Sequence, residues 1–284
     1  MGGEARGTCE AGGPATRPVR SWYTNGGIMN RLHSEIASTG PVAVVRLDGP
    51  FELLGAGAVW HLLVKLLADQ PDALVVDLSA VTFDDPQVLL LFGALARRAG
   101  IWPGIPVILV APDPAVRAAL HRQAVDRQAA VCARHGEALV LAHGAPVPAR
   151  LRESLLPEPG AARQARDVAT EACLRWELGW LVRPASIIAS ELVTNGVRHA
   201  GTPLELLLAR TARYLHVAVR DEDPRPAVRQ DPAPSAVSGR GLLIVEETAM
   251  SWGCAPAQTG QTGKVVWATL STGGAGGSGL PGRR

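Results

Sequence analysis

The segment SELVTNGVRHAGTP, residues 190–203, holds three polar side chains at helical spacing. Glu191, Asn195 and His199 occupy positions i, i+4 and i+8, so a helix would bring them to one face. An Asn side-chain oxygen is a hard ligand suited to Mg²⁺. A Glu one turn away can orient or deprotonate a hydroxyl that attacks a phosphate. Taken alone, the same pattern also fits the polar outer face of an amphipathic helix.

Two further motifs follow this segment. Asp221 ends an expected strand, where a carboxylate can accept a hydrogen bond from an exocyclic amine such as that of adenine, although Asp is also common in ordinary turns. Gly239, Arg240 and Gly241 then open an expected helix. The glycines allow close approach of the backbone, the helix N-terminus favours anions, and Arg240 adds a cation for phosphate. A single G-x-G is also an ordinary start of a helix.

The elements around these motifs predict an α+β sandwich with an antiparallel sheet. The apolar spacing predicts helices over residues 161–176, 185–200 and 241–249, and strands over residues 204–209, 215–221 and 264–270. Along the second of these strands, Leu215, Val217 and Val219 face one way, and His216, Ala218 and Arg220 the other. Residues 224–238 contain four prolines and predict a loop or lid.

The preceding part of the chain alternates strands and helices, which predicts an α/β sandwich. Strands are expected over residues 42–47, 73–78, 106–110 and 138–141, and helices over residues 56–68, 88–99 and 114–123. We also expect a short helix around residues 29–37.

Length and composition agree with two domains. The chain has 284 residues, of which 47% are hydrophobic and 19% charged, which excludes wholesale disorder. We expect an N-terminal tail at 1–38, a first domain at 39–143, a linker at 144–150, a second domain at 151–271 and a Gly-rich tail at 272–284.

The charge and the cysteines narrow the class of protein. A net charge of +2 gives no electrostatic case for direct binding of nucleic acid. The four cysteines form no C-x-x-C pair, which argues against zinc and disulfides. No apolar run is long enough for a membrane span, and the N-terminus has no hydrophobic signal core. We therefore expect a cytoplasmic protein.

The second domain resembles a known family. The ordered motifs SELVTNGVRHAGTP, VRDEDP, GRGLLIVEE, SWG and KVVWATL resemble the histidine kinase-like ATPase domain of anti-sigma factor kinases, especially the short regulatory ATPases of actinobacteria. The resemblance implies a GHKL (Bergerat-type) ATPase α/β sandwich that binds ATP and Mg²⁺. It implies that Glu191 is the catalytic base, that Asn195 is the Mg²⁺ ligand and that His199 lies close to the nucleotide. It further implies that Asp221 reads adenine and that residues 239–241 form the phosphate loop.

This sequence departs from the family pattern in two places. The family has D-x-G-x-G after the strand, whereas this chain has Asp221-Glu222-Asp223-Pro224-Arg225 and lacks both glycines. The family also often has Thr in the last strand near the base, where the aligned position here is Val265. We therefore expect weak affinity for ATP.

The first domain resembles a STAS domain, the fold of anti-sigma factor antagonists. The resemblance lies in the segment ALVVDLSAVTFDDPQVLLLFGALARRA. Antagonists carry an Asp-Ser pair at a helix start, and that Ser accepts phosphate. The pair here is Asp85-Pro86, which suits an N-cap and a first helical position. Pro86 has no hydroxyl, so phosphorylation at the usual place is excluded. Ser79 and Thr82 lie nearby but suit structural roles.

The two resemblances together imply a fused STAS–ATPase regulator of the anti-sigma factor type. The leading hypothesis is an ATP- and Mg²⁺-dependent protein serine/threonine kinase. It would phosphorylate a partner STAS-domain antagonist, sequester a sigma factor, or do both. The resemblance also implies a homodimer. The alternative is a non-catalytic STAS and ATP-binding scaffold in partner-switching signalling, for which Pro86 and the missing glycines argue.

Overall fold

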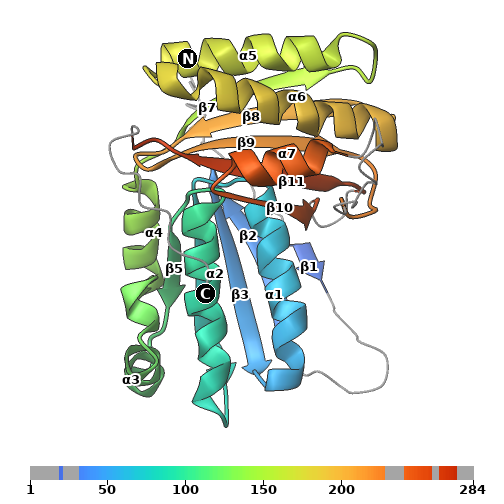
Figure 1. Cartoon of the computed structure of the whole chain (residues 1–284). Coiled ribbons are helices and arrows are strands. Elements are labelled where there is room, and N and C mark those ends of the chain that lie inside the picture. The colour runs from blue at the N-terminus through green and yellow to red at the C-terminus, as the bar shows by residue number, and fades with distance from the viewer. Residues whose placement is uncertain (1–18, 22–31, 228–239, 258–261, 274–284) are drawn as a thin grey trace, which may run out of the picture.

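The computed structural model describes residues 19–21, 32–227, 240–257 and 262–273. These residues form two domains, stacked one above the other in Figure 1. A six-stranded sheet of order β1-β2-β3-β4-β5-β6 organises the N-terminal domain, and a five-stranded sheet of order β10-β11-β9-β8-β7 organises the C-terminal domain. The predicted α/β and α+β architectures are confirmed. None of the helices in these ranges has the length and apolar character needed to cross a bilayer.

The N-terminal domain is built on parallel strands, because β3 to β6 run in one direction and are joined by helices. Both faces of its sheet are buried under helices. Helices α1, α2 and α3 pack on one face around Leu63, Phe92 and Leu109, and α4 covers the other. The elements are β1 (Val19–Ser21), β2 (His33–Thr39), β3 (Val42–Pro50), α1 (Leu53–Ala68), β4 (Ala73–Thr82), η1 (Pro86–Leu89), α2 (Leu90–Ile101), β5 (Val107–Val110), α3 (Pro114–Arg122), η2 (Val125–Arg127), β6 (Ala130–Cys132) and α4 (His135–His143).

The C-terminal domain has a fully antiparallel sheet among its described strands. Helices α5, α6 and α7 cover one face, where Ile188, Leu192 and Val217 are buried in a shared core. The elements are β7 (Ala149–Leu155), α5 (Ala161–Arg175), η3 (Gly179–Leu181), α6 (Val182–His199), β8 (Leu204–Arg210), β9 (Tyr214–Asp221), α7 (Gly241–Thr248), β10 (Ser251–Pro256) and β11 (Lys264–Ser271).

Three expectations from the sequence are wrong. The helix expected around residues 29–37 is contradicted from His33 onward, because β2 pairs with β3 there, inside what was assigned to the N-terminal tail. The strand expected over residues 138–141 is part of α4, whose Ala138 and Ala142 pack on the sheet one turn apart. The expected linker ends early, because Ala149 and Arg150 already belong to β7, at the edge of the second sheet.

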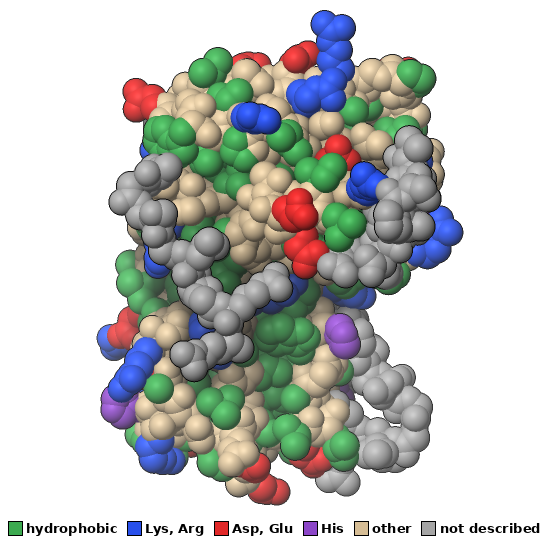
Figure 2. All heavy atoms as spheres, in the orientation of Figure 1, with side chains coloured by type: hydrophobic (Ala, Val, Ile, Leu, Met, Phe, Trp, Pro, Cys, Tyr) green, Lys and Arg blue, Asp and Glu red, His purple; other side chains and the backbone are tan. Residues whose placement is uncertain are grey.

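The outer face of the C-terminal sheet rests on the N-terminal domain. Trp60, Val64 and Ala68 form a stripe along α1 that packs against β9, β10 and β11. Just after α2, Trp102 stacks on Trp267 of β11 with ring centroids 5.0 Å apart. Figure 1 shows the upper ends of α1 and α2 reaching this sheet, and Figure 2 shows hydrophobic side chains at the junction of the two lobes.

Candidate functional site

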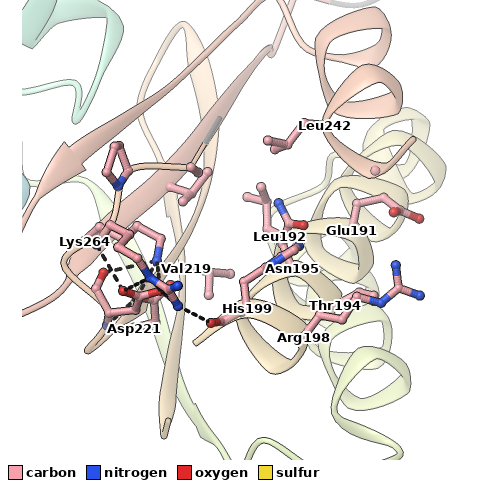
Figure 3. A pocket seen from close by; sticks show the side chains of 17 residues that line it. Glu191, Leu192, Thr194, Asn195, Arg198, His199, Val219, Asp221, Leu242 and Lys264 are labelled. Carbon is pink, nitrogen blue, oxygen red and sulfur yellow. Dashed lines mark hydrogen bonds and ion pairs between the residues drawn. The ribbon is translucent and has the colours of Figure 1, made fainter. Parts of the chain in front are cut away.

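The C-terminal domain contains a cavity of about 530 Å³ between α6 and the strands β9 and β11. Alternate residues of these strands point toward the helices, so that Val219, Asp221, Lys264 and Val266 line one wall. Helix α6 supplies the opposite wall, and Leu242 of α7 lies above both in Figure 3. The cavity therefore combines apolar side chains with several charged groups.

Helix α6 places the three predicted polar residues along this cavity. Its buried side chains, among them Ile188 and Leu192, anchor the helix to the sheet and fix its rotation. Glu191, Asn195 and His199 all line the cavity. In Figure 3 Asn195 lies in the space between α6 and the strands, and His199 lies nearer to Asp221. The three residues named from the spacing therefore lie at one cavity, together with other residues of the same helix: Leu192, Thr194, Gly196 and Arg198.

Glu191 lies against the start of α7. A Cβ atom added to Gly241, the first residue of that helix, would stand 2.8 Å from the Oε2 atom of Glu191. A carboxylate near a helix N-terminus is favoured by the unpaired N–H groups there. Arg240 is exposed and forms the N-cap position of α7, whereas Gly239 lies outside the described residues. The structure therefore brings Glu191 to the described part of the expected phosphate loop.

Asp221 and Lys264 form a buried ion pair at the other end of the cavity. The two residues are cross-strand partners in β9 and β11, and the Lys264 Nζ donates to Asp221 Oδ1 over 2.9 Å. Their side chains are only 3% and 7% exposed. Burial raises the pKa of Asp221, and the hydrogen bond from Lys264 opposes this rise. The ammonium thus favours the charged form of the carboxylate.

Two residues fill the place of the missing glycines. Arg225 donates from Nε and Nη2 to both carboxylate oxygens of Asp223, and its Nη2 also donates to the His199 carbonyl over 3.1 Å. The hydrogen bonds from Arg225 hold the pKa of Asp223 well below its usual range. This contact ties the segment after β9 to the C-terminal end of α6. An ion pair therefore lines the cavity where the family pattern has glycines.

The sequence analysis missed Lys264, Asp223 and Arg225 as site residues. The period-2 alternation of β11 was the signal that could have found Lys264, because it puts Lys264 and Val266 on one face. It puts Val265 on the other face, in the contact with the N-terminal domain. Val265 was expected near the base, but it does not line the cavity. Lys264, rather than Val265, is the residue of β11 that meets Asp221.

A glycine makes this end of the cavity possible. Gly263 has a φ of +125°, and a Cβ atom there would stand 2.1 Å from the Asp221 carbonyl oxygen. Only glycine lets the start of β11 approach the end of β9 this closely.

The comparison with protein families assigns both domains. Residues 155–270 match the histidine kinase-like ATPase domain, and residues 33–138 match the STAS domain. The chain contains a STAS domain and a histidine kinase-like ATPase domain. The two matches leave residues 1–32, 139–154 and 271–284 outside, and the middle segment holds the end of α4 and most of β7.

Relatives of known class match the STAS domain. An anti-sigma-F factor antagonist, RsfB of Mycobacterium tuberculosis, is 30% identical over 92 residues, which are 32% of this chain and 74% of the relative. Among solved structures, an anti-sigma factor antagonist from Mycobacterium paratuberculosis is 25% identical, with a TM-score of 0.36, over 41% of this chain and 97% of that one. The unphosphorylated anti-sigma factor antagonist SpoIIAA is 16% identical with a TM-score of 0.34, over 40% of this chain and 98% of that one.

The STAS domain presents Pro86 at its end remote from the ATPase domain. Strand β4 begins beside the interface, where Asp72 pairs with Arg150, and its ten residues span about 33 Å before Pro86 follows. Asp85 caps the short η1 helix by accepting from the Gln87 N–H, as expected for this pair.

Proposed function

We propose that this chain is a partner-switching regulator that binds Mg·ATP in the cavity of its ATPase domain and phosphorylates a serine of a separate STAS-domain antagonist. The observation that carries the proposal is the arrangement of Glu191, Asn195, His199 and Asp221 around one cavity. Their types and order agree with the ATPase family, and the relatives of the STAS domain are named as anti-sigma factor antagonists. A sigma factor is the other partner that this class of protein would sequester.

The residues present fit a magnesium ion held mainly by nucleotide phosphates. Mg²⁺ usually keeps several waters and takes few protein ligands. Asn195 offers one oxygen from α6, and no cage of three or more His, Cys, Asp or Glu side chains exists among the described residues. We infer that Asn195 is the protein ligand. The bound ion would neutralise charge on the transferred phosphoryl group.

Glu191 is the proposed general base. The serine Oγ of the partner would form a bond to the γ-phosphorus while the bond to the β–γ bridging oxygen breaks, which leaves ADP. The serine proton would pass to the Glu191 carboxylate. The position of Glu191 beside the first residue of α7 supports this role, because the phosphate end of a nucleotide would meet that helix N-terminus. Asp221, at the opposite end, would receive the base.

Transfer of label from γ-labelled ATP to candidate STAS proteins tests the kinase activity. Wild type should label a partner, and Glu191→Gln should reduce the rate about 10²–10⁴-fold while ATP still binds. Label transfer that survives Glu191→Gln at the wild-type rate would exclude Glu191 as the base. In a titration with and without Mg²⁺, Asn195→Ala should lose the Mg²⁺-dependent part of the ATP affinity.

A second candidate is a non-catalytic scaffold in which ATP acts as a structural ligand. Pro86 favours it, because this STAS domain has no hydroxyl at the usual acceptor position. ATP binding without label transfer to any STAS partner would support the scaffold. Label transfer to a partner would support the kinase.

A further inference from the structure

Lys264 is an unusual residue in its surroundings. It is one of only two lysines among the 28 Lys and Arg residues of the chain. It is 5% exposed, and on its face of β11 it is followed by the apolar Val266, Ala268 and Leu270. Burying an ammonium is expensive unless acceptors compensate it. The fold must therefore supply these acceptors from elsewhere.

The acceptors come from the end of β9 and the segment after it. The Lys264 Nζ donates to Asp221 Oδ1 over 2.9 Å and to the Asp223 carbonyl over 3.1 Å, and it lies 3.6 Å from Asp223 Oδ2. The N–H of Asp223 also donates to Asp221 Oδ1 over 2.9 Å. One ammonium thus fixes both the Asp221 carboxylate and the backbone of the segment that replaces the family glycines.

Stability alone is a weak reason for such a pair. Replacing a buried ion pair by apolar residues is often neutral or stabilising, because removing two charges from water costs much of their attraction. Both partners line the cavity instead of lying deep in the core. This location connects the pair to whatever the cavity binds.

The chemistry of Asp221 depends on its charge. An ionised carboxylate only accepts hydrogen bonds, whereas a protonated carboxyl group also donates one. A carboxylate therefore selects a donor such as an exocyclic amine. A protonated carboxyl group would also donate a hydrogen bond to a carbonyl oxygen at the same place. A cation beside Asp221 favours the ionised carboxylate, which accepts hydrogen bonds and donates none.

We propose that Lys264 is a positioning residue that gives the nucleotide site its selectivity for a 6-amino purine over a 6-oxo purine. It does so by holding the Asp221 carboxylate charged and in one orientation. This inference rests on the proposed binding of ATP and deepens it. Lys264 itself needs no contact with the base, because its donors already serve Asp221 and Asp223.

The test compares the affinities of the full chain for ATP and for inosine triphosphate, whose base has an oxo group in place of the amine. Calorimetric titration with Mg²⁺ present should show wild type binding ATP at least about tenfold more tightly. Lys264→Met should bring this ratio to about one, and Lys264→Arg should restore most of it. Lys65→Met removes the other lysine, on α1 of the STAS domain, and should keep the wild-type ratio.

The ratio of the two affinities distinguishes a positioning role of Lys264 from a purely structural role. Unfolded chains bind neither nucleotide, so partial unfolding lowers both apparent affinities equally and leaves their ratio unchanged. Lys264→Gln, which keeps a donor without the charge, serves if Lys264→Met folds poorly, and it should also lower the ratio. A wild-type ratio in Lys264→Met or Lys264→Gln would overturn the inference and leave ATP binding intact. Wild type that binds neither nucleotide would overturn the proposed function and this inference together.

Discussion

On the cavity face of the ATPase sheet the buried charges are paired, whereas on the face covered by the STAS domain buried nitrogens lack partners. Lys264 and Asp221 satisfy each other on the cavity face. The described residues contain five buried side-chain nitrogens without a hydrogen-bond partner, and all five belong to residues at or next to the STAS contact: Arg98 Nε, Trp102 Nε1, His216 Nε2, Arg220 Nε and Trp267 Nε1. The same two strands, β9 and β11, contribute to both faces.

The difference shows what each face is built for. An unpaired buried polar group costs about 1–3 kcal/mol, so these nitrogens oppose the apolar contact between the domains. The contact is held instead by packing, such as the stack of Trp102 on Trp267, and by the ion pairs of Arg220 with Asp69 and Arg150 with Asp72. The cavity face thus offers paired polar groups for recognition. The STAS face docks mainly through apolar packing, and its unpaired nitrogens lower the net free energy gained by the contact.

The largest effect is expected from removing the central ring of the docking face. Trp102 is fully buried, so Trp102→Ala should lower the free energy of unfolding by about 3–5 kcal/mol. Denaturant unfolding followed by circular dichroism measures this change. Trp180→Ala is the matched control, because its ring is 52% exposed and its loss should change stability by less than about 0.5 kcal/mol. Similar losses in the two variants would contradict the assigned packing.

Two glycines, one on each face, allow a sharper comparison. Gly263 has a left-handed backbone conformation, and in Gly263→Ala the new Cβ would clash with the backbone at the end of β9. We expect the free energy of unfolding to fall by about 3 kcal/mol and the nucleotide affinity to fall at least about tenfold.

Gly104 has a φ of +82°, and a Cβ atom there would stand 2.6 Å from the His216 Nε2 and 2.7 Å from the Thr211 Cγ2. Gly104→Ala should cost about 1–3 kcal/mol in the domain contact and leave nucleotide affinity unchanged, because the clash is with side chains on the docking face. Unfolding curves and nucleotide titrations of both variants measure the two effects. Equal losses of nucleotide affinity would show that the faces do not act separately.

His216 makes the docking face sensitive to pH. It is buried in the domain contact, where its Nδ1 pairs with the Thr269 hydroxyl, and burial lowers its pKa from 6.5 to about 4. The unfolded chain therefore binds a proton first as the pH falls. The contribution of neutral His216 to stability is complete above pH 6.5 and is lost as the pH falls from 6.5 toward 4.

At pH 5 the loss should reach about 2 kcal/mol relative to pH 7. Unfolding of wild type and His216→Gln at pH 7, 6 and 5 measures it. The variant should lose about 2 kcal/mol less over this range, and parallel curves for the two proteins would refute the assignment.

The sequence predicted the elements whose pattern is long and one-sided. The helices carrying Leu63 and Leu192 were found because their apolar residues repeat with the helical period over several turns. The apolar run from Ala138 to Leu141 was too short to distinguish a strand from a helix, and α4 resulted. Strand β7 was not predicted, and its first two residues were assigned to the linker, since an edge strand with many charges has little apolar alternation.

The candidate site was predictable where its residues are close in sequence. Glu191, Asn195 and His199 share one helix, so their spacing revealed their common cavity. The pairing of Asp221 with Lys264 joins residues 43 positions apart through the register of β9 and β11, which no local pattern reports. The same holds for the STAS contact, because Trp102 and Trp267 meet only after both domains have folded.

The smallest expected effect concerns the ion pair between Asp69 and Arg220, which joins the domains directly behind Asp221. Its Nη2 to Oδ1 distance is 2.9 Å, and the two side chains are 20% and 27% exposed. Partial exposure screens the attraction, so the coupling energy should be about 0.5–1 kcal/mol and should shrink in high salt. A double-mutant cycle of Asp69→Asn and Arg220→Gln, measured by unfolding at two salt concentrations, isolates this energy. Because Arg220 points to the STAS domain and Asp221 to the cavity, Asp69→Asn should leave the ATP to inosine triphosphate ratio unchanged, and a changed ratio would show that the docking face acts on base selection through β9.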